Sequence, residues 1–315
     1  EMMKEKGFAH MSEGALVVDV KEDTDTKEIP PCIILKSDGA SLYSTTDLAT
    51  LVMRMKENNP DRVIYLADAR QSMHFIQVFR CARKTGIVPD TTELVHIGFG
   101  TMNGKDGKPF KTRDGGVMRL EYLLKEIDDE MLNKIKENQK EKENLNIDEA
   151  EAEQTAKTVA LAAVKYGDLS NQASKDYIFD IDRFTSFEGN TGPYILYTIV
   201  RIKSILSKYE AKGGDISELK DAIMPAVNAG QKNLMLSLAK FNATIESAYE
   251  ESAPHKICAY IYELANAFNG FYHDTKILSE ENEELKKSYI SLLVLTKEIL
   301  EACIDMLGFS APDRM

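Results

Sequence analysis

The sequence predicts an α/β segment followed by an all-helical segment. Up to about residue 97, short apolar stretches of strand length alternate with stretches whose apolar residues recur at helical spacing. From about residue 121 onward, strand patterns are rare and helical spacing prevails. Strand, helix, strand, helix, strand in this order indicates a parallel sheet with crossover helices, whereas successive amphipathic helices indicate a bundle. A length of 315 residues accommodates about two domains.

The first strand is predicted at Cys32–Leu35, followed by a turn at Ser37–Gly39 and a brief return strand at Leu42–Tyr43. A helix follows, with Thr45 or Thr46 as its N-cap, because four apolar residues recur at the spacing of one helical face. These residues are Leu48, Leu51, Val52 and Met55.

The second and third strands flank a second helix. Arg62–Ala67 is predicted as a strand, and Asp68 and Gln71 have the spacing of a capping box that opens a helix. The third strand is predicted at Leu94–Ile97. One face of the intervening helix is apolar and consists of Phe75, Val78, Phe79 and Ala82.

Residues suited to ligand binding follow each of these three strands. Open parallel sheets bind their ligands beyond the carboxyl ends of the strands, so we expect the three strand ends to meet at one rim and form a site there. The residues at these ends are Tyr43, Asp47, Asp68, Gln71, His96 and Gly98.

A glycine-spaced, lysine-bearing segment, residues 96–113, begins within the third strand and continues beyond it. Such a loop can bring mobile cations and backbone N–H groups to a polyphosphate. Gly, Asp and Lys also make ordinary solvated turns. The spacing alone therefore fits both a nucleotide-handling loop and a plain turn.

The remainder of the chain is predicted as helices. A turn-rich stretch at Ser186–Gly192 precedes Pro193, which suits the first turn of a helix. The other predicted helices span about residues 121–144, 147–166, 217–229, 232–249, 254–272 and 280–307.

Composition argues against several function classes. No apolar run approaches the roughly 20 residues that span a bilayer, and the first residues lack the pattern of a signal peptide, so we expect a cytoplasmic location. Four distant cysteines in apolar contexts favour reduced core thiols over a disulfide framework, and we expect no structural metal. A net charge of -12 argues against nucleic-acid binding through a general basic coat but leaves room for a local basic track.

Five groups of motifs occur in order along the chain. They are Lys36–Gly39 with Tyr43–Ala49, then Asp68–Phe75, then His96–Gly100 leading into Lys108–Gly115, then Phe187–Tyr194 with Tyr197 and Arg201, and finally Ser310–Met315. In this order they resemble the arginyl-tRNA synthetase family of class I aminoacyl-tRNA synthetases. The likeness covers almost the whole chain.

The resemblance implies a fold with three parts. Residues 1–135 would be the second half of a Rossmann-like class I synthetase catalytic domain with a KMSKS-like loop, 136–175 connecting helices, and 176–315 a helical-bundle anticodon-binding domain. The class I HIGH motif is not found. His96–Phe99 lacks its second histidine and lies too close to the KMSKS-like loop to be that motif.

The resemblance also implies roles at an arginine site and an ATP site. Asp47 would grip the arginine guanidinium through two parallel N–H···O bonds, with the Tyr43 hydroxyl beside it and Gln71 orienting the amino-acid end. ATP, accompanied by Mg²⁺, would be bound by His96, Gly98 and Lys111. The catalytic cations would be Lys108, Lys111 and Arg113, with the dominant one left open.

In the helical half, the resemblance implies tRNA contacts at Tyr194, Tyr197 and Arg201, and the residues themselves fit the core of a bundle equally well. Other plain roles also stay open from the residues alone. Asp47 fits a first-turn acid, Gln71 half of a capping box, and Tyr43 a core aromatic. His74 is interpreted as structural, since its neighbour is apolar.

The implied function is ATP-dependent activation of arginine to arginyl-adenylate and its transfer to tRNA(Arg) in protein synthesis. Because the HIGH motif is not found, we predict that this chain alone is not competent for adenylation. The full-length enzyme is expected to be a monomer, and this chain to self-associate through an exposed strand edge. An alternative hypothesis is a free-standing tRNA-binding module without catalysis.

Overall fold

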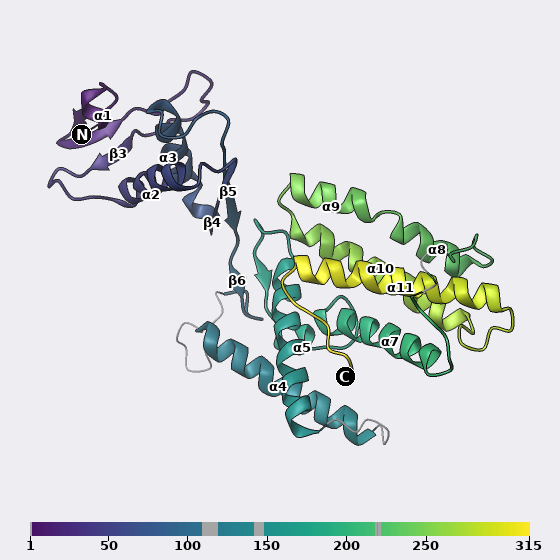
Figure 1. The fold of residues 1–315 in the computed structure, drawn as a ribbon. Helices are drawn as coiled ribbons and strands as arrows, with labels where there is room; N and C mark the ends of the chain where they lie inside the picture. Colours follow the sequence, from purple (N-terminus) through teal and green to yellow (C-terminus); the bar gives the residue numbers. More distant parts are fainter. Residues whose placement is uncertain (1, 109–118, 142–147, 218, 220–221) are drawn as a thin grey trace. The chain divides into compact units, whose positions relative to one another are not determined.

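The computed structural model describes the chain except residues 1, 109–118, 142–147, 218 and 220–221 (Figure 1). It divides into two compact units. The first comprises Glu1–Thr101 and Ser174–Asp176, and the second comprises Met102–Ala173 and Tyr177–Met315. None of the described helices is long and apolar enough to cross a membrane.

The first unit begins with helix α1 (Met2–Glu5) and an antiparallel sheet in the order β1-β2-β3. In this sheet Val18 is the register partner of Cys32. Its strands are β1 (His10–Ser12), β2 (Ala15–Val18) and β3 (Cys32–Leu35).

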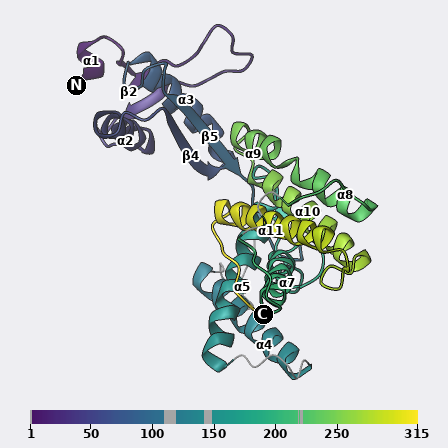
Figure 2. The same cartoon turned by 45° about the vertical axis from the view of Figure 1, so that its right-hand side comes forward.

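A second sheet in this unit consists of β4 (Arg62–Asp68) and β5 (Glu93–Phe99), which pair in parallel (Figure 2). In their register Tyr65 lies opposite His96. The predicted rim of three strand ends is therefore wrong in one respect. The ends of β4 and β5 lie together, but the strand at Cys32–Leu35 pairs with β2 in the antiparallel sheet. A short apolar run satisfies either kind of partner, so its composition did not distinguish them.

Helix α2 (Tyr43–Glu57) starts earlier than predicted. Tyr43 is its first residue, so the predicted return strand at Leu42–Tyr43 is wrong. Thr45 and Thr46 lie inside the first turn rather than at the N-cap, which is Leu42. Thr45 Oγ1 instead accepts a hydrogen bond from the Leu42 N–H at 3.0 Å, and it donates one to the Ile34 carbonyl at 2.5 Å. This hydroxyl ties the start of α2 to β3.

The crossover from β4 to β5 consists of a 3-10 turn, η1 (Ala69–Gln71), and helix α3 (Ser72–Lys84). Asp68 caps the turn by accepting the Arg70 N–H at 2.8 Å, so the predicted capping box with Gln71 does not form. The predicted apolar face of this helix does lie in the core or beside it. Buried residues of that core include Val18, Leu51, Val78, Cys81 and Ala82.

The second unit is mainly helical and has its own core, which includes Tyr166, Ile199, Phe268 and Phe271. A short parallel pair joins β6 (Met102–Asn103) to β7 (Tyr177–Ile178). Its helices are α4 (Leu120–Glu141), α5 (Glu149–Leu169), α6 (Ile181–Phe184), α7 (Gly192–Glu210), α8 (Ala229–Leu238), α9 (Phe241–Glu250), α10 (Pro254–Asp274) and α11 (Glu283–Met306).

Two helix predictions in this unit are corrected. The described residues between 217 and 229 are not helical before Ala229, where Asn228 caps α8 by accepting the Gln231 N–H at 2.8 Å. Pro225 lies inside the predicted span and is incompatible with a helix interior. The predicted helix at 232–249 is divided between α8 and α9.

Helices α5 and α7 approach closely at Gly192. A Cβ atom built on Gly192 would overlap the carbonyl group of Ala162. Gly270, in α10, has nothing within 4 Å of its Cβ position. The two glycines therefore make a matched pair of sites for adding a single methyl group.

We predict that Gly192→Ala destabilises the helical unit by about 1–3 kcal/mol, because the added methyl forces α7 away from α5. Gly270→Ala should instead leave the unit unchanged or stabilise it by up to ~1 kcal/mol through helix propensity. Urea unfolding followed by the helical circular dichroism signal measures both. Equal midpoints for the two variants would contradict the close approach.

Candidate functional site

The candidate arginine-binding residues lie on α2 and at the start of α3. Tyr43 and Asp47 are one turn apart on α2, and the Tyr43 side chain is 85% exposed. An exposed ring is not a core aromatic, so that alternative for Tyr43 is excluded. Gln71 is exposed at the boundary of η1 and α3. No direct contact joins Tyr43, Asp47 and Gln71 among the interactions of the described residues.

Asp47 has a partner that sequence reasoning missed. The Nε2 atom of His74, on α3, lies 2.7 Å from Oδ2 of Asp47, and the two side chains are 26% and 27% exposed. His74 follows Gln71 by three residues and so lies on the same side of the start of α3. That spacing is the available signal, and the contact with Asp47 adds a polar partner to the structural interpretation of His74.

His74 connects Asp47 to the candidate ATP-binding strand. Its ring meets the ring of Phe75 edge-on, with centroids 5.0 Å apart. Phe75 is buried and stacks on His96 of β5 at a centroid distance of 4.4 Å. The structure therefore gathers Asp47, His74, Phe75 and His96 into one group of contacts, which we call the Asp47 cluster.

Two polar atoms in the middle of the parallel pair are buried and have no hydrogen-bond partner among the described residues. They are the Tyr65 hydroxyl and Nε2 of His96, which occupy opposite positions of β4 and β5. Burial raises the pKa of the Tyr65 hydroxyl, and the Asp47 carboxylate acts in the same direction while Arg54 opposes it. One of these unpaired atoms thus belongs to the Asp47 cluster, and the other belongs to a tyrosine that packs against Phe75.

Gly98 lies in β5 because this strand extends to Phe99, two residues beyond the prediction. A Cβ atom at this position would lie 2.8 Å from the Cα of Ala69 in η1. The backbone of β5 passes so close to η1 that a side chain does not fit. This gives Gly98 a packing reason that is separate from its predicted role in ATP binding.

The lysine-bearing loop is described as far as Lys108, and Lys111 and Arg113 lie outside the described residues. Gly104–Lys108 forms a turn in which the Gly104 N–H donates to the Lys108 carbonyl at 2.8 Å. Lys105 binds two carboxylates, Asp180 at 3.0 Å and Asp182 at 3.1 Å, which raise its pKa. Lys108 is exposed. Lys105 is thus paired with two carboxylates. Of the three predicted catalytic cations, Lys108 is the one that lies among the described residues.

The predicted tRNA-binding residues come together on the second unit. The Tyr194 hydroxyl donates to Oδ1 of Asn266 at 2.6 Å and accepts from Nδ2 of Asn269 at 2.9 Å. Asn269 Oδ1 in turn accepts a hydrogen bond from Nη1 of Arg201 at 2.6 Å. The guanidinium carbon of Arg201 lies 4.7 Å from the centre of the Tyr197 ring and 5.4 Å from that of Tyr272.

These six residues form what we call the Tyr194 cluster, with three members from α7 and three from α10. The predicted residues from α7 are half-buried, whereas Tyr272 is 41% exposed. Asn266, Asn269 and Tyr272 were missed by sequence reasoning. Their signal is the spacing of three residues that places Asn266, Asn269 and Tyr272 beside one another along α10.

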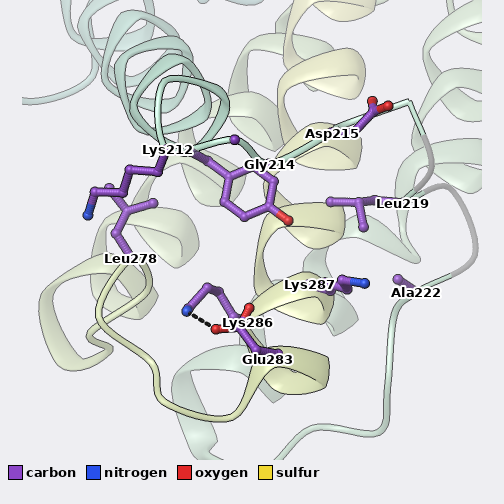
Figure 3. Close-up of a pocket in the computed structure, with 11 residues that line it drawn as sticks. Lys212, Gly214, Asp215, Leu219, Ala222, Leu278, Glu283, Lys286 and Lys287 are labelled. Carbon is purple, nitrogen blue, oxygen red and sulfur yellow. Dashed lines mark hydrogen bonds and ion pairs between the residues drawn. The ribbon is translucent and has the colours of Figure 1, made fainter.

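A pocket of about 490 Å³ lies between the end of α7 and the start of α11 (Figure 3). Lys212, Lys286 and Lys287 line it, and Lys286 is paired with Glu283 at 2.6 Å. None of the predicted site residues lines this pocket. Among the described residues, no group of three or more His, Cys, Asp or Glu side chains is arranged to hold a metal ion.

Two family models match the chain. Residues 1–181 match tRNA synthetases class I (R), catalytic domain, and residues 195–315 match the DALR anticodon binding domain. An arginine–tRNA ligase of Alkaliphilus oremlandii (strain OhILAs) is 53% identical over 315 residues, covering 100% of this chain and 52% of that protein.

Solved structures show the same similarity. An arginyl-tRNA synthetase from Plasmodium falciparum has a TM-score of 0.81 and 26% identity, covering 100% of this chain and 51% of that one. The arginyl-tRNA synthetase of Thermus thermophilus has a TM-score of 0.82, with 100% of this chain and 57% of that chain covered, and its 23% identity indicates the fold alone.

This chain spans about half the length of the curated relatives it matches. The matches confirm the fold class predicted from the sequence, an α/β catalytic part followed by a helical anticodon-binding part. The catalytic-domain model alone covers residues 1–181, more than half of the 315 residues. The chain therefore belongs to the arginyl-tRNA synthetase family of class I aminoacyl-tRNA synthetases.

Proposed function

We propose that this chain supplies part of the catalytic domain and the anticodon-binding domain of an arginine–tRNA ligase. The reaction is ATP-dependent activation of arginine to arginyl-adenylate, followed by transfer of arginine to tRNA(Arg). The Asp47 cluster carries this proposal, because its contacts connect the residue assigned to the guanidinium with a residue assigned to ATP. Both substrates of the first step would then bind beside each other.

The proposed roles follow from charge and hydrogen bonding. Asp47 pairs with the guanidinium, with the exposed Tyr43 hydroxyl beside it, and Gln71 orients the amino-acid end. The arginine carboxylate attacks the α-phosphate of ATP and the bond to the β-phosphate breaks, which releases pyrophosphate. His96 and Gly98 would contact ATP.

The loop cations would stabilise the charge that develops on the phosphates during this step. They are Lys108, Lys111 and Arg113. The exposed position of Lys108 supports its availability to contact the phosphates. Mg²⁺ would enter with ATP as part of the substrate and would offset part of the negative charge of its phosphates.

For the second step, we propose that the Tyr194 cluster contacts tRNA(Arg). A half-buried cation held against two tyrosine rings offers both charge and stacking surface, which are the two features used to bind single-stranded bases.

We also propose the division into residues 1–135, 136–175 and 176–315, and a cytoplasmic location. The family matches to residues 1–181 and 195–315 support a boundary between the catalytic and anticodon-binding parts close to residue 176.

The first prediction concerns adenylate formation. The 315-residue chain alone should show no arginine-dependent ATP–pyrophosphate exchange, with or without tRNA, because no HIGH motif is present in it. A fusion that adds the amino-terminal half of the Alkaliphilus oremlandii relative should restore exchange. Exchange by the chain alone would overturn the first expectation, and a folded but inactive fusion would count against the proposed function.

The second prediction concerns tRNA. Arg201→Ala should weaken binding of tRNA(Arg) about tenfold, because one charged contact of this kind is worth ~1–3 kcal/mol. Lys208→Ala, which removes an exposed cation from the same helix, is the matched control and should change affinity less than about twofold.

Filter binding with tRNA(Arg) and a non-cognate tRNA at two salt concentrations separates specific recognition from general charge attraction. If both variants bind tRNA(Arg) as the unmodified chain does, the Tyr194 cluster is a structural feature of the bundle. Retained tRNA binding by a fusion that still lacks exchange activity would favour the alternative of a tRNA-binding module without catalysis.

The third prediction concerns self-association. Among the described residues, β4 and β5 pair only with each other, and Leu66 of β4 is 71% exposed. We expect the isolated chain to associate through this sheet, and Leu66→Asp to weaken the association about tenfold, since burying a leucine is worth ~1.5–3 kcal/mol. Leu236→Asp, at a 56% exposed position of α8, is the control. A clean monomer at high concentration in sedimentation velocity would contradict this expectation.

A further inference from the structure

We propose that His74 is a positioning residue for arginine recognition, which holds the Asp47 carboxylate in the orientation that receives the guanidinium. The inference rests on the proposed function, because it takes Asp47 as the guanidinium partner. Its basis is the contact of 2.7 Å between His74 Nε2 and Asp47 Oδ2, which joins α3 to α2 across 27 residues of sequence.

The hydrogen-bonding capacity of a carboxylate allows both partners at once. Each oxygen offers two lone pairs, and a guanidinium uses one lone pair on each oxygen. A bond from His74 to Oδ2 therefore leaves Oδ1 and the second lone pair of Oδ2 available. What His74 removes is the freedom of the Asp47 side chain to rotate, so that less conformational entropy is lost when arginine binds.

The ring of His74 is itself held in place. It packs edge-on against Phe75, which is 5% exposed and contacts Tyr65 at a centroid distance of 5.0 Å and Phe79 at 5.7 Å. The aromatic side chains packed beside β4 and β5 thus hold the His74 ring in place, and the His74 ring in turn holds the Asp47 carboxylate. An ordinary surface ion pair has no such support.

A second histidine–aspartate pair in this chain provides a comparison, because it is largely exposed. His10 and Asp19 lie 3.8 Å apart in the same unit, and their side chains are 53% and 63% exposed. That distance exceeds a hydrogen bond, and exposed pairs of this kind contribute little. His10→Gln is therefore a control that changes a histidine beside an aspartate without touching the Asp47 cluster.

The test uses the fusion described above, which contains all 315 residues and has both substrates available. His74→Ala should raise the KM for arginine about tenfold while leaving the KM for ATP within about twofold, because only the guanidinium partner loses its orientation. His74→Gln, which keeps a neutral N–H donor at similar reach, should recover most of the loss. His10→Gln should behave as the unmodified fusion.

A double-mutant cycle separates the two assignments. Asp47→Asn should raise the KM for arginine more than His74→Ala does, and adding His74→Ala to Asp47→Asn should cause no further rise. An unchanged KM in Asp47→Asn would remove Asp47 from the arginine site and so contradict the proposed function. A strong effect of Asp47→Asn with none of His74→Ala, or fully additive effects, would overturn the role of His74 alone.

A second measurement does not depend on catalysis. Imidazole ¹H–¹⁵N spectra of the 315-residue chain, with the His74 signals assigned through His74→Gln, should show a shift of those signals in Asp47→Asn. The signals of His10 should stay unchanged. Unmoved His74 signals would mean that the two side chains are not in contact, which would also overturn the proposal.

Discussion

The parallel pairing of β4 with β5 is the constraint on which the candidate site depends. Parallel neighbours cannot be joined by a tight hairpin, so the chain must cross from the end of one strand to the start of the next. Here the crossover is η1 and α3, which carry Gln71, His74 and Phe75. Because Tyr65 faces His96 in this register and Phe75 contacts both rings, the strand register fixes the position of the helix that bears His74.

In the helical unit, helix packing rather than strand pairing brings the polar residues of the Tyr194 cluster together. Helices α7 and α10 bury their apolar faces in a common core, and the polar positions that remain on each helix meet at its edge. Asn269 binds both Tyr194 and Arg201 from the facing helix. The packing of α7 against α10 therefore determines where the residues of the Tyr194 cluster lie. The side chains at those positions determine which hydrogen bonds the cluster makes.

Sequence periodicity predicted the strands at β3, β4 and β5 and the helices around them, because burial imposes a repeat that a single chain displays. It did not predict the partner of β3, since the apolar run Cys32–Leu35 is compatible with a parallel or an antiparallel neighbour. Pro225 is a signal in the sequence against the helix predicted at 217–229, because a proline disrupts a helix interior.

For the candidate site, the motif order led to the prediction of Asp47 and His96 but could not show that His74 and Phe75 connect them. Contacts between residues far apart in sequence depend on how elements pack, and motif order and periodicity do not report that packing. The same holds for Asn266 and Asn269, which look like ordinary polar positions until α10 is placed against α7.

The arrangement around Asn269 also sets a direction for the hydrogen bonds of this surface. Since Asn269 donates to the Tyr194 oxygen, the hydroxyl proton of Tyr194 points to the carbonyl oxygen of Asn266. The oxygen atoms of both amides are thus engaged internally, while the amide N–H groups of Asn266 and the further N–H groups of Arg201 are donors. In the proposed contact with tRNA(Arg), these N–H groups would donate to acceptor atoms such as phosphate oxygens and base carbonyls.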